Sequence, residues 1–138
     1  MARREQRGTI TLWMLGLCVA VLFVGGLSVD LWRVIAVRRS LVAMADAGAT
    51  AGANGLDPAS LRAGTLTLDP LTARAAARNA LEAQSGWSWV EAANIDVAPQ
   101  SVTVTLRARV HFSLLGIFVR GKPIEVEASS SASPRETG

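Results

Sequence analysis

Few residues in this chain are of types that carry chemistry, and their spacing makes no catalytic set. The single histidine, His111, alternates with apolar residues and is predicted to lie on the polar face of a strand. The single cysteine, Cys18, lies inside a long apolar run, so no intrachain disulfide can form and a metal site would lack ligands. Glu125 and Glu127 are a close pair of carboxylates, but they alternate with apolar residues as strand residues do. We therefore expect no enzyme activity, no cofactor and no metal.

An uncharged run of 22 residues, Gly8 to Val29, dominates the amino-terminal part of the chain. As a helix it would be about 33 Å long, enough to cross a hydrocarbon core of about 30 Å. The sequence therefore predicts a single transmembrane helix over 9–29, with membrane lipid as its surroundings and the plasma membrane as its location.

Charges flank this run on both sides. Residues 1–8 form a basic leader that is predicted to stay in the cytoplasm, with the carboxyl-terminal domain outside it. Arginines follow the run at Arg33, Arg38 and Arg39. The apolar run is longer than a signal-peptide core, so we expect an uncleaved anchor, with a cleaved leader and a secreted protein as the alternative.

No basic patch interleaves with aromatic residues, so nucleic acid is not an expected partner.

The helix is predicted to continue over 30–54, because this stretch lacks proline and keeps a helical period. Asp30 and Arg33 are three apart and are expected to pair on its surface. One broad apolar face is expected to consist of Leu31, Val34, Ile35, Leu41, Val42 and Ala45. Past Met44 the side chains become small, which indicates either close approach of another backbone or a fraying helix end. Asn54-Gly55 is expected to cap the helix.

Residues 55–128 are predicted to form one small α+β domain. Pro58 after Asp57 can open a single helical turn, and Asp69-Pro70 begins a second helix that runs to about Gln84. A three-stranded antiparallel meander follows and is expected to cover Val34, Ile35, Leu41 and Val42 of the long helix. The polar, serine-rich segment 129–138 is predicted to be a disordered tail.

The strands are indicated by apolar residues at every second position. Ile95 and Val97 form a short strand, and Pro99-Gln100 makes a turn. The core face is then predicted to comprise Val102, Val104, Leu106, Ala108, Val110, Phe112, Ile124, Val126 and Ala128. On the polar face we expect Arg107 opposite Glu127 and Arg109 opposite Glu125, with the hairpin turn near Ile117.

Two apolar segments are open to more than one interpretation. The loop that contains Leu114, Leu115, Ile117 and Phe118 is either core, lipid-facing or a contact for a partner protein. Trp87 and Trp89 are interpreted as core residues rather than a binding platform.

The segment of about 7–57 resembles the amino-terminal part of TadE/TadG-like proteins of the Flp, or tight-adherence, pilus apparatus. The shared features are an Arg-Gly pair opening the span (Arg7, Gly8), an Asp–apolar–x–Arg group closing it (Asp30, Arg33), and an alanine-rich stretch around Asp46. The final strand resembles, more loosely, the ending of short actinobacterial members.

The resemblance implies a pilin-like layout and a membrane component of pilus assembly or secretion that contacts other machinery proteins, as a homo- or hetero-oligomer. TadE-type pseudopilins of this family are expected to be cut after a glycine and to have glutamate at the fifth mature position; this chain has Gly8, but the fifth residue counted from Thr9 is Trp13. The chain is therefore closer to the anchored TadG type than to processed pseudopilins. The alternative is a membrane-anchored extracytoplasmic binding module unrelated to pili.

Overall fold

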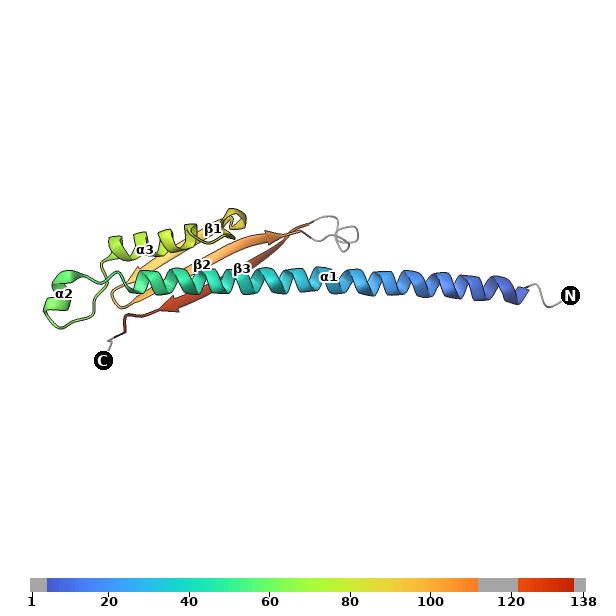
Figure 1. The fold of residues 1–138 in the computed structure, drawn as a ribbon, viewed down its shortest axis with the longest axis horizontal. Coiled ribbons are helices and arrows are strands. Elements are labelled where there is room, and N and C mark those ends of the chain that lie inside the picture. Colours follow the sequence, from blue (N-terminus) through green and yellow to red (C-terminus); the bar gives the residue numbers. More distant parts are fainter. Residues whose placement is uncertain (1–4, 112–121, 136–138) are drawn as a thin grey trace.

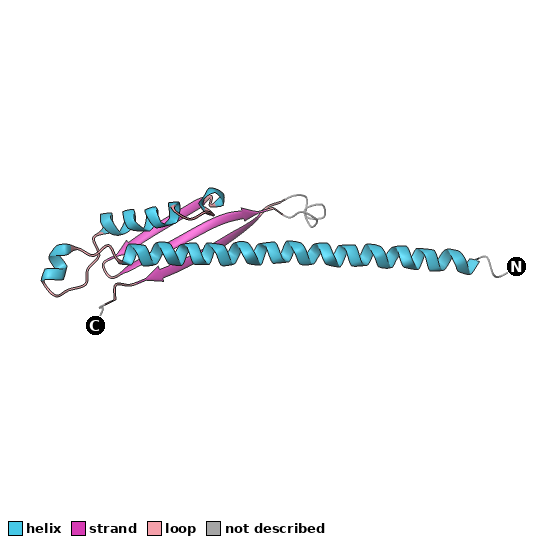
Figure 2. Cartoon of the chain, in the orientation of Figure 1, coloured by secondary structure: helices cyan, strands magenta, loops and turns pink. Residues whose placement is uncertain are grey.

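The structure, a computed structural model, describes residues 5–111 and 122–135, with side chains from residue 9 onward. Its elements, in chain order, are α1 (Glu5–Ala53), α2 (Pro58–Arg62), α3 (Pro70–Glu82), a 3₁₀ helix (Trp87–Trp89), β1 (Ala92–Ala98), β2 (Ser101–Val110) and β3 (Ile124–Ala132). The sheet and α3 gather beside the carboxyl-terminal half of α1, whose amino-terminal half projects beyond them (Figure 1). The fold is α+β, as predicted, with one long helix, shorter helices and a three-stranded antiparallel sheet (Figure 2).

One face of α1 packs against the sheet and α3. Leu41, Ala45 and Ala49 on this face are fully buried. The predicted face was partly wrong, because Ile35 is 43% exposed and Val42 is 45% exposed. A helix turns about 100° per residue, so Val42 lies about a quarter turn from the fully buried Leu41 and leaves the covered face. Leu31 is exposed for a similar reason, whereas Val34 and Val37 pack against the core.

The small residues at the end of α1 allow close approach rather than marking a frayed end. A Cβ added at Gly52 would lie 2.9 Å from Val102 Cγ1 and 3.1 Å from the Ala73 carbonyl oxygen. At Gly55, just after α1, an added Cβ would lie 2.5 Å from Ala73 Cα. Glycine is therefore required at 55 because α3 begins against it.

Aspartate caps both short helices, and for Asp69 this cap was predicted. Asp57 accepts hydrogen bonds from the backbone N–H groups of Ala59 and Ser60 before α2. Asp69 accepts from the Thr72 hydroxyl and from the Thr72 backbone N–H before α3. These bonds, the hydroxyl first, hold the pKa of the Asp69 carboxyl below its ordinary value of 3.8. Since folding lowers this pKa, the cap stabilises the fold above pH 3.8 and is lost as the pH falls through the folded value.

The sheet has the order β1-β2-β3, a meander. The predicted alternation is confirmed along β2, where the even-numbered residues Val102, Val104, Leu106, Ala108 and Val110 are buried. The predicted β2–β3 register is also confirmed, with Arg107 opposite Glu127 and Arg109 opposite Glu125. Phe112 and the predicted turn near Ile117 lie outside the described residues.

The expectation of a tail from 129 onward was wrong for its first four residues. Ser129–Ala132 continue β3, and Ser130 and Ala132 pair with Val104 and Val102. Serine hydroxyls replace apolar contacts here: Ser129 bonds Thr105 and Ser131 bonds Thr103, each at 3.1 Å. Composition alone suggested disorder because these side chains are polar, but their partners are supplied by β2.

Candidate functional site

The amino-terminal half of α1, over Thr9–Gly25, is an apolar surface that no other described element covers; it is called the bare helix below. All side chains from Thr9 to Gly25 are exposed, with Trp13 77% and Leu22 74% exposed. Over Thr9–Ala53 the helix is long and apolar enough to cross a membrane, judged by length and composition. Exposure of so many large apolar side chains is unfavourable in water and favourable in lipid. Cys18 lies on this surface and is exposed, in keeping with an apolar filler.

The sheet side of α1 becomes covered at Gly26 and Asp30, both of which are buried. Asp30 is 2% exposed, although its neighbours Val29 and Leu31 are 66% and 58% exposed. Asp30 is therefore not on the surface, as was expected for its pairing with Arg33, whereas Arg33 itself is exposed. No buried side-chain oxygen or nitrogen in the described part of the chain lacks a hydrogen-bond partner. A satisfied, buried carboxylate thus marks the junction between the bare helix and the rest of the fold.

Asp46 connects α1 to the sheet in the last third of the packed half of the helix. Its Oδ1 accepts a hydrogen bond of 3.1 Å from the Ser130 hydroxyl of β3. This bond fixes the position of β3 along the helix, a role that the sequence did not reveal because Ser130 was placed in the tail.

The other predicted site residues are not brought together with these. Arg7 and Gly8 belong to the first turns of α1, and their side chains are not among those described. Arg33 is exposed. The segment with Leu114, Leu115, Ile117 and Phe118 lies outside the described residues. Trp87 packs partly against the core, as interpreted, whereas Trp89 is 40% exposed and its ring lies over Gly86.

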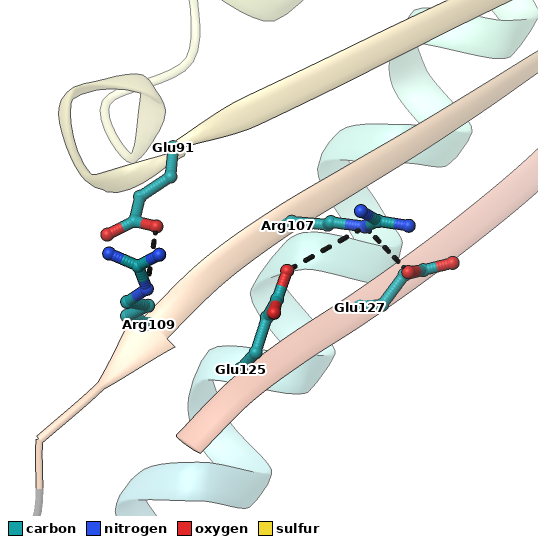
Figure 3. A network of polar contacts seen from close by, with 5 residues as sticks. All are labelled: Glu91, Arg107, Arg109, Glu125 and Glu127. Carbon is teal, nitrogen blue, oxygen red and sulfur yellow. Dashed lines mark hydrogen bonds and ion pairs between the residues drawn. The ribbon is translucent and has the colours of Figure 1, made fainter. Parts of the chain in front are cut away.

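Charged side chains form a network on the outer face of the sheet (Figure 3). Arg107 Nε lies 2.7 Å from Glu127 Oε2 and 3.8 Å from Glu125 Oε1. Arg109 Nε lies 3.1 Å from Glu91 Oε2 instead. Arg109 and Glu125 are therefore opposite each other in the strand register, as expected, but Arg109 forms its ion pair with Glu91. Glu91 was missed, although the two-residue turn at Pro99-Gln100 fixes the β1–β2 register that brings it near. All five side chains are about half exposed, which is typical of surface ion pairs of small effect.

None of the described residues forms a group that resembles a reaction centre. His111 is exposed at the end of β2. No group of three or more His, Cys, Asp or Glu side chains suited to a metal ion occurs among the residues described. Within the described part of the chain, the bare helix is the most distinctive surface.

Comparison with known proteins bears on the helix. Residues 8–55 match a family model described as "Putative Flp pilus-assembly TadE/G-like". No curated protein matches the chain, and no solved structure matches it. The matched segment runs from the first turns of α1 through its packed face to Gly55, and it excludes α2, α3 and the sheet. The long apolar helix with its buried Asp30 is therefore the part of this chain that is similar to TadE/G-like Flp pilus-assembly proteins.

Proposed function

We propose that this protein is a non-enzymatic, single-span component of a Flp/Tad-type pilus assembly or secretion apparatus in the plasma membrane. Its amino terminus lies in the cytoplasm, and its sheet domain (α2, α3 and the three strands) lies outside. It acts through contacts with other membrane proteins of that machinery. The observation that carries the proposal is the family match over 8–55, which falls on the bare apolar helix.

The arrangement of the fold supports this proposal. The same helix that is bare over Thr9–Gly25 supplies the core of the sheet domain through Leu41, Ala45 and Ala49. Without any flexible linker between them, a force or a partner acting on the sheet domain is transmitted directly to the membrane segment. Such rigid coupling suits a component of an assembly that spans the envelope.

Cross-linking in the source cells tests the assignment to this machinery. The full-length protein is cross-linked in its membrane and purified in mild detergent. It should then be cross-linked to the polytopic platform proteins that work with the secretion ATPase of a pilus system. A Val21→Arg variant, whose insertion into the membrane is expected to be weakened, provides the background. Recovery of envelope proteins of another kind at the level of a specific partner would favour the alternative, a membrane-anchored binding module unrelated to pili.

The anchored TadG type is the subtype that we propose. Trp13 occupies the position where a processed pseudopilin is expected to have glutamate, and its ring is exposed on the bare helix. A carboxylate there would pair with the free amino terminus of a neighbouring subunit, which an indole cannot do. Mass spectrometry of the purified protein should find Met1 or Ala2 as the first residue. A chain that starts at Thr9 would contradict this subtype and indicate a processed pseudopilin.

A further inference from the structure

Three arginines beyond the bare helix lie within two turns of one another, and all three are exposed: Arg33, Arg38 and Arg39. Arg38 and Arg39 make no ion pair with any described carboxylate. By contrast, the sheet arginines Arg107 and Arg109 are paired with glutamates. Among the described residues, two full positive charges next to the apolar helix thus have no carboxylate as an ion-pair partner.

The three arginines surround the helix instead of lying on one face. At about 100° per residue, the steps from Arg33 to Arg38, to Arg39 and back to Arg33 are about 140°, 100° and 120°. Arg33 and Arg38 flank the side that packs on the sheet, and Arg39 points away from it. A partner helix would contact only one side, whereas a layer of headgroups encloses a helix on every side that is not covered by the sheet.

The tryptophans indicate the depth at which this ring lies. Trp13 and Trp32 are 77% and 75% exposed, and 19 residues separate them. This spacing corresponds to about 28 Å along the helix, close to the thickness of the hydrocarbon core, and tryptophan prefers the two interfaces. Arg33 directly follows the second interface, and Arg39 lies about 10 Å beyond Trp32. A headgroup layer of about 5–8 Å lies within reach of both side chains.

The sheet domain reaches the same level. The Ser130–Asp46 hydrogen bond fixes β3 along α1, and the two run side by side (Figure 1). Ile124 precedes Ser130 by six residues, about 20 Å of strand, which equals about 13 residues of helix. Ile124, 45% exposed, therefore lies near the level of Arg33, and the exposed Lys122 lies slightly nearer the bare helix.

From this geometry we propose that Arg33, Arg38 and Arg39 form an arginine ring that binds anionic phospholipid headgroups and seats the sheet domain on the membrane surface. The proposal rests on the proposed function in one respect, the membrane span. The ring supplies charge complementary to phosphodiester groups, and Trp32 beside it reports the lipids that it gathers.

Tryptophan quenching by brominated lipids tests the ring. The full-length protein is reconstituted in phosphatidylcholine–phosphatidylglycerol vesicles that contain brominated phosphatidylglycerol or, at equal mole fraction, brominated phosphatidylcholine. The Trp32 signal is the difference between the wild type and Trp32→Phe. Brominated phosphatidylglycerol should quench this signal more strongly. In Arg38→Gln/Arg39→Gln the preference should fall by about fivefold for each arginine removed.

Two further variants serve as controls. Arg62→Gln/Arg74→Gln removes two exposed arginines from α2 and α3 and should leave the preference unchanged. Arg38→Lys/Arg39→Lys keeps the charge and should retain most of it. Equal quenching by both lipids in the wild type, or the same loss in the α2/α3 control, would overturn the ring.

Failure of the ring can be distinguished from failure of the proposed function. A protein that stays in the vesicles through a carbonate wash but shows no lipid preference contradicts the ring alone. A protein that leaves the vesicles contradicts the span and hence both proposals. Loss of a cross-linked dimer in Arg38→Gln/Arg39→Gln, with lipid preference unchanged, would assign the arginines to a second copy and overturn the ring.

Discussion

At single positions of this protein, the room left by neighbouring atoms restricts the residue type as much as chemistry does. Gly55 is an example, because the sequence suggested a helix cap and the structure shows a contact. Its φ is not positive, so no special backbone conformation requires glycine. The requirement comes from Ala73, whose backbone nitrogen and Cα would lie within 2.6 Å of an added Cβ. Backbone atoms at the start of a helix move only if the helix moves.

Gly55→Ala is therefore expected to destabilise the fold by about 1–3 kcal/mol, the usual effect of overpacking. Gly16→Ala is the matched control, since an added Cβ at Gly16 meets nothing within 4 Å. Thermal unfolding in detergent, followed by circular dichroism, measures both changes. Equal midpoints for Gly55→Ala and the wild type would mean that α3 does not press on Gly55.

At the scale of elements, the β2–β3 hairpin carries both the core and the charged face. The even-numbered side chains of β2, with Val126 and Ala128 of β3, are buried in the core, and odd-numbered side chains of the hairpin carry the ion pairs. The alternation is strict because strand side chains point to opposite faces, so a slip of one residue would exchange the two sets.

The two faces should therefore respond very differently to substitution. Val104→Asp places an unpaired carboxylate at a fully buried position and should cost at least about 3 kcal/mol, preventing stable accumulation. Arg109→Gln removes a half-exposed ion pair with Glu91 and should cost about 0–1 kcal/mol. Protein yield and urea unfolding compare them. If Val104→Asp accumulates and unfolds like the wild type, the even-numbered face is not the core.

At the scale of the whole molecule, the two halves of α1 have different surroundings. Its first half is bare and apolar all round, and its second half has one buried face. The buried face begins at Gly26 and Asp30, before the exposed Trp32, so the covered part of α1 follows the bare part with no gap between them. The sheet domain is thus expected to stand directly on the membrane.

Arginine substitutions at two valines of α1 test this division. Val21→Arg places a charge near the middle of the bare half and should weaken membrane insertion by about 2.5–3.5 kcal/mol. Val42→Arg, at a site 45% exposed beside the sheet domain, should leave insertion intact. Carbonate extraction of membranes separates the outcomes. Retention of Val21→Arg in the pellet at wild-type level would show that the bare half is not the span.

A reporter fusion tests the orientation. An enzyme that is active only outside the cytoplasm, fused after Gly138, should be active, because the basic leader is expected to remain inside. A silent fusion at normal protein level would mean that the topology is reversed. The arginine ring would then lie in the cytoplasmic leaflet, where the same lipid assay applies.

The sequence by itself determined the features that depend on local period and local capping. The apolar run, the Asp69-Pro70 helix start, the alternation along β2 and the Arg107–Glu127 register are all readable from neighbours in the chain. Only the tertiary structure decided which face of α1 is covered, since a quarter turn separates Leu41 from Val42 and nothing local selects between them. It also decided the burial of Asp30, the pairing of Glu91 with Arg109, and the extension of β3 through Ser129–Ala132. In each case the deciding contact joins residues far apart in the chain, and a polar side chain is ordered by a partner that its own segment does not contain.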